Sequence, residues 1–452
     1  MRRKYLVDNY LQNYSVGEKW RLTANDNDNV SQVVVIPAYA EKELLFFTLA
    51  SIAKNSSSSL ENSFVLCVVN NKDDSPSEDM ENNFWTIECL DALITGKSLK
   101  KFSDEHKIYP LLCNIADSKL KLGYINAASK GFEMPRNTGG VGLARKIGMD
   151  MAVRLLERNS VSSGAILCLD ADTLVSDRYL SVIKKYFAEK TKTAIVAYEH
   201  QMPDNYEQRA AIVCYEIFLR YWILGLRYAQ SPWAFHSIGS TISVSSEAYV
   251  AVRGMNRREA GEDFYFLNKL AKTGEINYIK ETCVYPSARL STRVPFGTGK
   301  SMQRFLSQIS KEEFYNLYDV RIFTILRDWL KLMKGSFILD ENEILKKAGE
   351  IHALLEKFLR INDFAIIWQK IRRNSKDEKT LARQFNDWFD GFKTLKLINY
   401  FTKEIYPHAD MFDALDDILV MSGMQKTEQR SGIKIPELED QIEILQYLRS
   451  IT

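Results

Sequence analysis

The chain has 452 residues, which exceeds one ordinary domain and predicts two or three units, each large enough to bury a core. Its 60 basic and 58 acidic side chains leave a formal charge of +2, which gives no electrostatic basis for a nucleic-acid partner. The basic first residues lead into no apolar run, and the most apolar stretch, 210–229, carries Glu216, Arg220 and Arg227. We therefore expect neither a secretory signal nor a transmembrane helix.

The six cysteines lie far apart, without a CxxC pair, and most fall in apolar runs. This favours small buried hydrophobes in a reducing compartment over a disulfide framework, zinc binding or redox chemistry. The expected location is cytoplasmic, and peripheral contact with the inner face of the membrane stays open.

The first half of the chain alternates between apolar strands and helical segments. Residues 33–36 form a β-branched run ended by Pro37, and 41–54 follow with apolar residues at helical spacing. A second strand is expected at 64–69, with a helical stretch near 84–93. We expect a third strand near 108–113.

After a glycine-rich turn, 143–156 predict a helix, and 165–169 are a fully apolar strand. This alternation predicts an α/β fold, with a Rossmann-like, mostly parallel sheet and helices on both faces. Ligands of such sheets bind beyond the carboxyl ends of the strands. The polar residues that follow the strands should therefore converge on one edge: Tyr39, Glu41, Asn70, Asn71, Asp170 and Asp172.

The character of the chain changes after Pro295, because no proline recurs before Pro407 and apolar residues take helical spacing. We expect residues 1–300 to form the catalytic domain and 301–452 a helical accessory domain. That domain can mediate homodimerisation, hold a substrate, or dock on a membrane.

Asp170 and Asp172 leave the sheet directly after a strand, and side chains two apart point in similar directions. Hard oxygen ligands suit Mg²⁺ or Mn²⁺, which commonly bridge a carboxylate to substrate phosphates. On an isolated loop the same pattern would only start a turn. Placement after a strand, with a second acidic pair downstream, favours a metal site.

The second acidic pair is Glu262 and Asp263, which follow a glycine and open an apolar helix. One acid is explained by the helix dipole, which favours negative charge in the first turn. A carboxylate that faces the ligand can take a proton from an acceptor hydroxyl. Sequence does not say which of the two faces it, because neighbours in a helix point about 100° apart.

These pieces together resemble glycosyltransferases of the large GT-A family 2 group, over about residues 33–270. The resemblance is carried by Val35-Ile36-Pro37-Ala38-Tyr39, Gly139-Gly140-x-Gly-x-Ala-Arg145, Asp170-Ala171-Asp172 and Gly261-Glu262-Asp263. It implies a GT-A fold, a nucleotide bound at the first two strand ends, and a diphosphate neutralised by metal at Asp170 and Asp172. It also implies that Asp263 is the catalytic base, with Glu262 as the alternative.

Pro37, Tyr39, Glu41, Asn70 and Asn71 are then the expected donor-binding residues of the first two strand ends. Asn70 and Asn71 stand where the family commonly has an acidic pair that holds the nucleobase. Amides can still pair with a base edge, since each has donor and acceptor atoms. The identity of the nucleobase therefore stays open.

Two basic segments supply further donor-binding candidates. The helix start near Gly139 can hold an anion on its free N–H groups with Arg145 beside it, and a plain glycine-rich turn explains the segment equally well. Residues 286–300 combine Arg289, Arg293 and Lys300 with glycines. We expect a loop that closes on the diphosphate or an anionic acceptor through Arg293, or else a linker.

His236 is interpreted as a structural histidine and is left out of the metal site. The function that we predict is transfer of a hexose from a nucleotide diphosphate sugar to a hydroxyl of a saccharide, a lipid-linked or another acceptor, with inversion. Alternatives are a retaining enzyme, a sugar nucleotidyltransferase, and a non-catalytic scaffold that binds nucleotide or carbohydrate.

Overall fold

The structure is a computed structural model that describes residues 2–159, 161, 164–291, 297–307, 314–427 and 434–452. The chain divides into two compact units. Unit 1 holds Met1–Gln201 and Ser237–Arg289, and unit 2 holds Met202–His236 and Thr298–Thr452. The short stretch 290–297 is divided between the two units.

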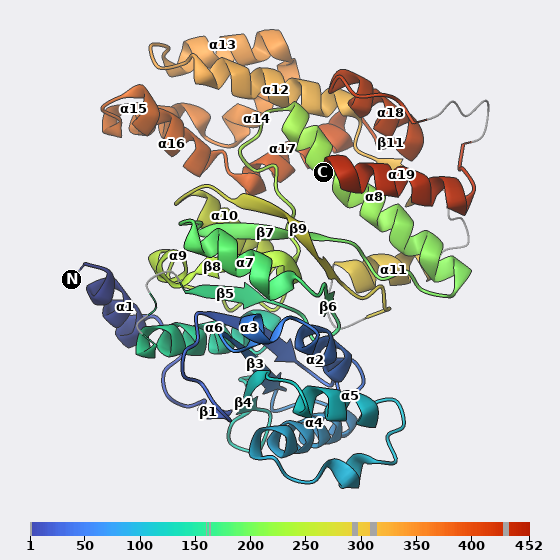
Figure 1. Ribbon diagram of the computed structural model, residues 1–452. Helices are drawn as coiled ribbons and strands as arrows, with labels where there is room; N and C mark the ends of the chain where they lie inside the picture. The colour runs from blue at the N-terminus through green and yellow to red at the C-terminus, as the bar shows by residue number, and fades with distance from the viewer. Residues whose placement is uncertain (1, 160, 162–163, 292–296, 308–313, 428–433) are drawn as a thin grey trace. The chain divides into compact units, whose positions relative to one another are not determined.

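Unit 1 is built on one nine-stranded sheet with the order β1-β4-β3-β2-β5-β8-β7-β9-β6 (Figure 1). The strands are β1 (Leu22–Ala24), β2 (Gln32–Ala38), β3 (Ser63–Asn70), β4 (Lys121–Ala127), β5 (Ala165–Cys168), β6 (Leu174–Val175), β7 (Thr193–Tyr198), β8 (Ile242–Ser245) and β9 (Asn277–Tyr285). β1 and β6 lie at the two ends of this order.

The parallel arrangement that the sequence predicts is confirmed for four neighbouring strands, β4, β3, β2 and β5. Val33 of β2 pairs with Phe64 of β3 on one side and with Ile166 of β5 on the other. Beyond β5 the sheet is mixed, because β8 runs antiparallel to both β5 and β7. The carboxyl ends of β2, β3 and β5 therefore share one edge, as a parallel register requires.

Helices of unit 1 cover this sheet, and every residue of β3 is buried. The helices are α1 (Arg2–Asn13), α2 (Leu45–Ala53), α3 (Ser57–Leu60), α4 (Ser77–Thr95), η1 (Leu99–Phe102), α5 (Tyr109–Ala116), α6 (Val141–Arg158), α7 (Tyr179–Ala188), η2 (Gly239–Thr241), α9 (Ser246–Ala251) and α10 (Glu262–Ala271). α6 packs closely on β2 and β3 at Gly148, where a Cβ atom would lie 2.4 Å from Val35 Cγ1.

The strand expected near 108–113 is wrong, because this segment lies in the helix α5. Pro110 stands in its first turn, where a missing N–H breaks no helical hydrogen bond. The true third strand is β4, in which Gly123 and Asn126 dilute the apolar pattern. A short apolar run fits a strand or a buried helix equally well, so periodicity alone could not decide.

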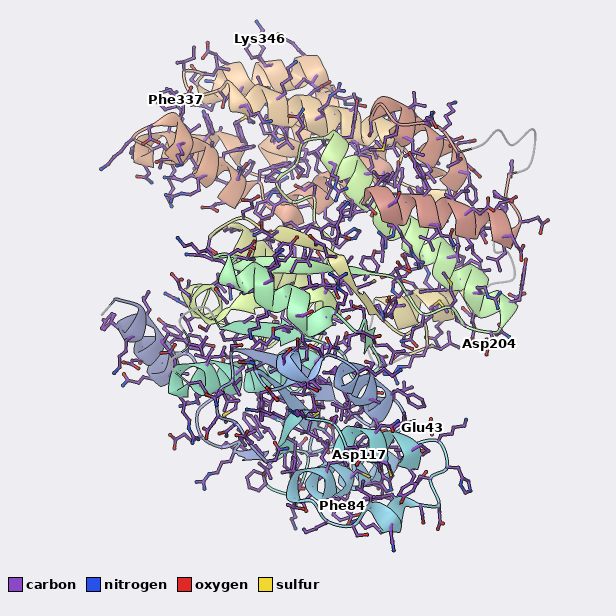
Figure 2. All side chains as sticks on the ribbon, in the orientation of Figure 1. Glu43, Phe84, Asp117, Asp204, Phe337 and Lys346 are labelled. Carbon is purple, nitrogen blue, oxygen red and sulfur yellow. The ribbon has the colours of Figure 1, made fainter. Side chains whose placement is uncertain are left out.

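Unit 2 is helical, as predicted for the C-terminal third. Its helices are α8 (Tyr206–Tyr228), α11 (Thr298–Ser307), α12 (Val320–Lys334), α13 (Glu341–Ile351), α14 (Ala353–Ile361), α15 (Phe364–Asn374), α16 (Glu378–Trp388), α17 (Gly391–Glu404), α18 (Met411–Met421) and α19 (Leu438–Ile451). The strands β10 (Asn316–Leu317) and β11 (Ala409–Asp410) pair beside them. Figure 2 shows Asp204 just before α8 and Lys346 on α13.

α8 belongs to unit 2 although it precedes residue 300 in the chain. It packs against α11, α12, α18 and α19. Two of its charged residues, Glu216 and Arg220, are buried as an ion pair, and Arg449 of α19 also binds Glu216. The domain boundary at residue 300 stays a prediction, and the longest segment by which the compact units differ from it is Met202–His236.

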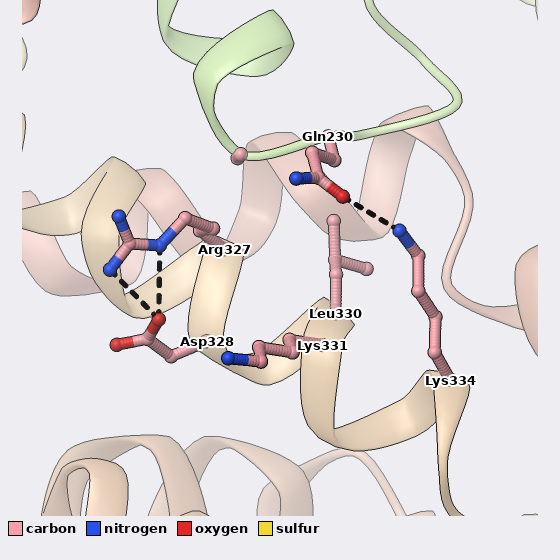
Figure 3. Close-up of a pocket in the computed structure, with 7 residues that line it drawn as sticks. Gln230, Arg327, Asp328, Leu330, Lys331 and Lys334 are labelled. Carbon is pink, nitrogen blue, oxygen red and sulfur yellow. Dashed lines mark hydrogen bonds and ion pairs between the residues drawn. The ribbon is translucent and has the colours of Figure 1, made fainter. Parts of the chain in front are cut away.

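Aromatic side chains form the core of unit 2, as expected from their helical spacing. The ring of Trp329 lies 5.7 Å from that of Phe364 and 5.8 Å from that of Phe385. Beside this core, the end of α8 and the second half of α12 enclose a cavity of about 480 Å³ (Figure 3).

All six cysteines are free thiols and four of them are buried, which agrees with the absence of a disulfide framework. Over the part of the chain that the structure describes, no helix combines the length and apolar character that crossing a bilayer requires.

Candidate active site

Three acidic side chains of unit 1 lie close together beyond the ends of β2 and β5. Asp170 and Asp172 follow β5, and Glu41 follows β2. The guanidinium of Arg289 joins two of them, because its Nε lies 2.8 Å from Asp172 Oδ2 and its Nη2 binds Glu41 Oε1. Glu41 is almost fully buried, so this is a largely desolvated ion pair.

Asp172 is held in place through its backbone and carries a perturbed carboxyl group. Gln201 Nε2 donates to the carbonyl oxygens of Asp172 and Tyr285, which ties this loop to β9. Burial is the main cause that raises the pKa of Asp172 to about 7. The charges of Asp170 and Glu41 act in the same direction, and the charge of Arg289 opposes them.

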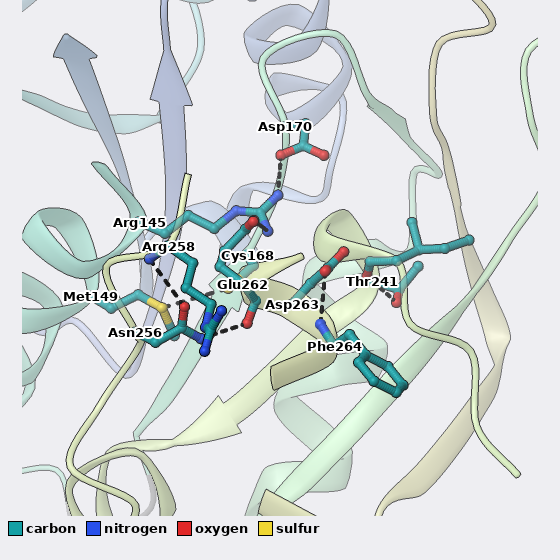
Figure 4. A network of polar contacts seen from close by, with 11 residues as sticks. Arg145, Met149, Cys168, Asp170, Thr241, Asn256, Arg258, Glu262, Asp263 and Phe264 are labelled. Carbon is teal, nitrogen blue, oxygen red and sulfur yellow. Dashed lines mark hydrogen bonds and ion pairs between the residues drawn. The ribbon is translucent and has the colours of Figure 1, made fainter. Parts of the chain in front are cut away.

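Arg145 joins the DxD segment to the second acidic pair (Figure 4). Its Nη1 donates to Glu262 Oε1 at 2.7 Å and its Nη2 binds Asp170 Oδ1. The side chain is 3% exposed, and its position on α6 brings it below the end of β5. Gly239 makes room for it, since a Cβ atom there would lie 2.1 Å from Arg145 Nη1.

The two acids at the start of α10 have different surroundings (Figure 4). Glu262 is buried and paired with Arg145, and burial raises its pKa to about 7. Asp263 is half-buried, and its Oδ1 accepts the N–H of Phe264 at 2.7 Å. Burial also raises the pKa of Asp263. Within the described residues no cation forms a salt bridge with Asp263.

The glycine-rich turn before α6 is covered by backbone. A Cβ atom on Gly142 would lie 2.3 Å from the carbonyl oxygen of Arg258, and one on Gly140 would lie 2.8 Å from Glu259 Cα. Asn256 fixes the covering loop by donating to the carbonyl of Glu262 at 2.9 Å. The glycines therefore allow the start of α6 and the loop at 256–259 to approach each other closely. This favours the interpretation of the segment as a plain glycine-rich turn.

The ends of β2 and β3 carry the residues expected to bind the nucleotide. Pro37 lies within β2, and Tyr39 donates its hydroxyl to Asp79 on α4 at 2.5 Å. Asn83 donates to the carbonyl of Asn70 and to Asn71 Oδ1, so Asn71 is held by internal contacts. Asn70 Oδ1 is buried and accepts no hydrogen bond from the described residues.

The donor atoms of this site suit a hard divalent cation. Carboxylates that repel one another, with the pKa of Asp172 raised to about 7, form an oxygen donor set that positive charge stabilises. Among the described residues, no group of three or more His, Cys, Asp or Glu side chains is arranged as a complete metal site. Further ligands would therefore have to come from substrate phosphates or water.

Sequence reasoning missed three residues of this site. Sequence reasoning treats Arg289 only as one of several cations in its segment, yet it binds Glu41 and Asp172. Arg293, the cation expected to contact the diphosphate or an anionic acceptor, lies outside the described residues. Gln201 and Asn83 carry no motif that would reveal their positioning contacts. His236 lies in unit 2, where burial lowers its pKa well below the ordinary value, as fits a structural histidine.

No protein-family model matches the chain, and no curated protein sequence matches it. Among solved structures, TarS 1-349 of S. aureus in complex with UDP-GlcNAc is similar, with 13% identity, a TM-score of 0.37, and coverage of 93% of this chain and 90% of that one. The mannosyltransferase PcManGT of Pyrobaculum calidifontis, in complex with GDP-Man and Mn²⁺, matches with 13% identity and a TM-score of 0.34 over 86% and 96%. At such scores the likeness carries no weight for function, which must be argued from the site itself.

Proposed function

We propose that the chain is a glycosyltransferase that transfers a sugar from a nucleotide diphosphate sugar to a hydroxyl acceptor, with inversion at the anomeric carbon. The observation that carries the proposal is the convergence of two acidic sets through Arg145 beyond the strand ends of unit 1. The resemblance of the same motifs to GT-A family 2 agrees with this proposal.

In this proposal Asp170 and Asp172 hold Mn²⁺ or Mg²⁺. The metal would stabilise the negative charge that develops on the leaving diphosphate. Binding would redistribute the two arginines, because Arg145 and Arg289 now contact these carboxylates. Arg289, released from Asp172, would be placed to contact the diphosphate through its planar fork.

Asp263 takes the role of general base. It receives the proton of the acceptor hydroxyl while the acceptor oxygen forms a bond with the anomeric carbon. The bond from that carbon to the diphosphate breaks, and its electron pair leaves with the phosphate. One observation favours Asp263 over Glu262: the carboxylate of Glu262 is occupied by Arg145, whereas Asp263 forms no salt bridge with any described residue.

The nucleobase is placed at the ends of β2 and β3. Asn70 Oδ1 would accept an N–H of the base, since it has no partner among the described residues, and Tyr39 would offer its ring. The acceptor, a cytoplasmic location and contact with a membrane belong to the same proposal and rest on the sequence.

A donor panel tests this function. Thermal unfolding is measured with UDP-, GDP-, CDP- and TDP-sugars, with and without Mn²⁺, for the wild type, Asp172→Ala and the control Asp177→Ala, an exposed acid just after β6. We expect one nucleotide series to stabilise the wild type and the control in a metal-dependent way, and not Asp172→Ala. Absence of metal-dependent stabilisation by every donor would favour the non-catalytic scaffold.

Product analysis separates the remaining alternatives. An inverted anomeric carbon supports the base mechanism, and a retained one leaves Glu262 and Asp263 with a binding role. Release of pyrophosphate from a nucleoside triphosphate and a sugar phosphate would show a nucleotidyltransferase instead.

A further inference from the structure

The cavity of unit 2 is lined by a cluster of cations on one face of α12 (Figure 3). Arg327, Lys331 and Lys334 stand at spacings of four and three, so they share a face of the helix. One carboxylate, Asp328, lies among them, which leaves an excess of two positive charges on the wall. Buried Leu330 and Ala229 add an apolar surface between these polar groups.

Two of the cations are held in fixed positions. Arg327 donates from Nε to Asp328 Oδ1 at 3.0 Å, and its Nη1 binds the hydroxyl of Tyr228. Lys334 Nζ donates to Gln230 Oε1 at 2.8 Å. Lys331, by contrast, is exposed and makes no hydrogen bond or ion pair with any residue that the structure describes.

Gln230 faces these cations from the loop after α8, in a backbone conformation that is unusual for its type. Its φ angle is 54°, in the left-handed region where a helix usually places glycine after its last turn. Its Oε1 is used by Lys334, while its Nε2 group donates to no described residue. The side chain thus adds an amide donor to a cationic wall.

The helix dipole explains only part of this arrangement. Lys331 and Lys334 lie in the last turn of α12, where positive charge is favoured at the surface. The dipole requires neither Arg327, one turn earlier, nor a strained glutamine opposite the lysines. It also creates no cavity, and a volume of about 480 Å³ falls in the range of small-molecule sites.

We infer that this cavity binds a phosphate ester. Lys331 and Lys334 would neutralise the phosphate, Gln230 Nε2 would donate to one of its oxygens, and Leu330 with Ala229 would contact the carbon atoms of the ester group. The phosphate can belong to a soluble metabolite or to a lipid headgroup. The inference does not rest on the proposed function, because every lining residue belongs to unit 2 and no transfer step is involved.

Hydrogen exchange of the full chain, with and without inorganic phosphate at constant ionic strength, tests the soluble source. We expect slower exchange at 226–231 and 327–335 in the wild type. Lys331→Glu and Lys334→Glu should each weaken apparent binding about tenfold, the loss of one charge-assisted hydrogen bond. Lys346→Glu, the same change at an exposed lysine of α13, should bind as the wild type does.

Sedimentation with vesicles tests the lipid source. Binding to phosphatidylglycerol but not phosphatidylcholine vesicles, lost in Lys331→Glu and kept in Lys346→Glu, would assign the phosphate to a headgroup. Protection by inorganic phosphate without sedimentation would assign it to a soluble ester. If neither assay separates the two cavity variants from Lys346→Glu, with all variants folded by circular dichroism, the inference is overturned.

Discussion

Glu262 and Asp263 are neighbours in the chain, yet their surroundings give them different chemistry. Glu262 is paired with the guanidinium of Arg145, while Asp263 accepts only a backbone N–H within the described residues. A base must be free to take a proton, so we assign the two acids separate tasks. In the proposed mechanism, Glu262 positions Arg145 and Asp263 takes the proton of the acceptor.

We predict that Asp263→Asn lowers kcat by about 10²- to 10⁴-fold, the usual contribution of a general base. The KM for the donor should change little, because the amide keeps the contact with Phe264. Steady-state kinetics with the donor identified by the panel check this. An Asp263→Asn enzyme with normal kcat would remove Asp263 from the mechanism.

Glu262→Gln should behave differently, since it removes a charge that holds Arg145. We expect a higher donor KM and a smaller loss of kcat than in Asp263→Asn, because Arg145 would then contact Asp170 alone. If Glu262→Gln loses activity as completely as Asp263→Asn, with unchanged KM, Glu262 is the better candidate for the base.

Asp172 gives a prediction for stability. Its pKa rises from the ordinary 3.8 to about 7 in the folded protein, so the folded state holds this proton more tightly than the unfolded chain. Ionisation of Asp172 therefore costs stability as the pH rises from about 4 to about 7. Relative to the wild type, Asp172→Asn should raise the free energy of unfolding by up to about 4 kcal/mol above this pH range and by almost nothing below it.

Urea unfolding in the presence of a chelator, at about pH 4 and about pH 8, measures this gain. Asp177→Asn, the same change at an exposed acid, is the matched control. A constant difference between Asp172→Asn and the wild type at both pH values would show that burial does not perturb this carboxyl group.

Part of the site could be predicted at this scale and part could not. Residues that end a strand, such as Asp170 and Asp172, are placed by the strand itself, and sequence located them. Arg289 reaches Asp172 from more than a hundred residues away, and no local pattern records such a pairing. Sequence therefore favoured Arg293 within the same segment.

Among the elements, the glycine-rich start of α6 makes a steric demand that is set by backbone atoms. Gly142→Ala would place a methyl group 2.3 Å from the carbonyl oxygen of Arg258. This oxygen belongs to the backbone, so no side-chain rotation can relieve the clash. We expect a loss of about 1–3 kcal/mol, typical of overpacking. Gly274→Ala is the matched control, because nothing lies within 4 Å of its Cβ position. Equal denaturation midpoints for both variants would contradict the packing role of the turn.

At the end of α8, introducing a glycine should stabilise the protein, whereas at the start of α6 removing one should destabilise it. Gln230 holds a left-handed conformation, so Gln230→Gly should stabilise unit 2 by about 1 kcal/mol through relief of backbone strain. The same change removes the amide from the cavity and should weaken phosphate binding. Thermal unfolding checks the first effect and hydrogen exchange the second. A variant that is less stable than the wild type would show that the contact with Lys334 outweighs the strain.

Element prediction failed where two structures fit the same short pattern. The run at 108–113 is apolar enough for a buried strand, but Pro110 suits a helix start, and α5 forms there. β4 was missed because Gly123 and Asn126 interrupt its apolar residues. Long apolar runs such as β3 were located to within a residue, since burial on both faces leaves little ambiguity.

For the whole molecule, the two units predict two separate ligand responses. A donor with Mn²⁺ should slow hydrogen exchange in unit 1, at the ends of β2, β3 and β5 and at the start of α10. Inorganic phosphate should slow it in unit 2, at the end of α8 and in α12. Protection by the donor confined to unit 2 would contradict the placement of the active site.

The order of the helices in the sequence does not reveal that α8 belongs to unit 2. Its apolar and charged residues have the same pattern that a catalytic-domain helix would have, and the predicted boundary at residue 300 rests on the change of character after Pro295. Its partners α11, α12, α18 and α19 all come later in the chain, and only long-range packing identifies them.

This order of partners has a consequence for synthesis on the ribosome. α8 leaves the exit tunnel early, with Ile217, Tyr221 and Leu224 destined for a buried face. α19, which packs on it, is translated more than two hundred residues later, after roughly 10–40 s at typical elongation rates. α11, α12 and α18 emerge earlier, so the part of the α8 surface that α19 covers stays exposed longest. Chaperone capture of the growing chain should therefore begin at α8 and end only when the last helix has emerged.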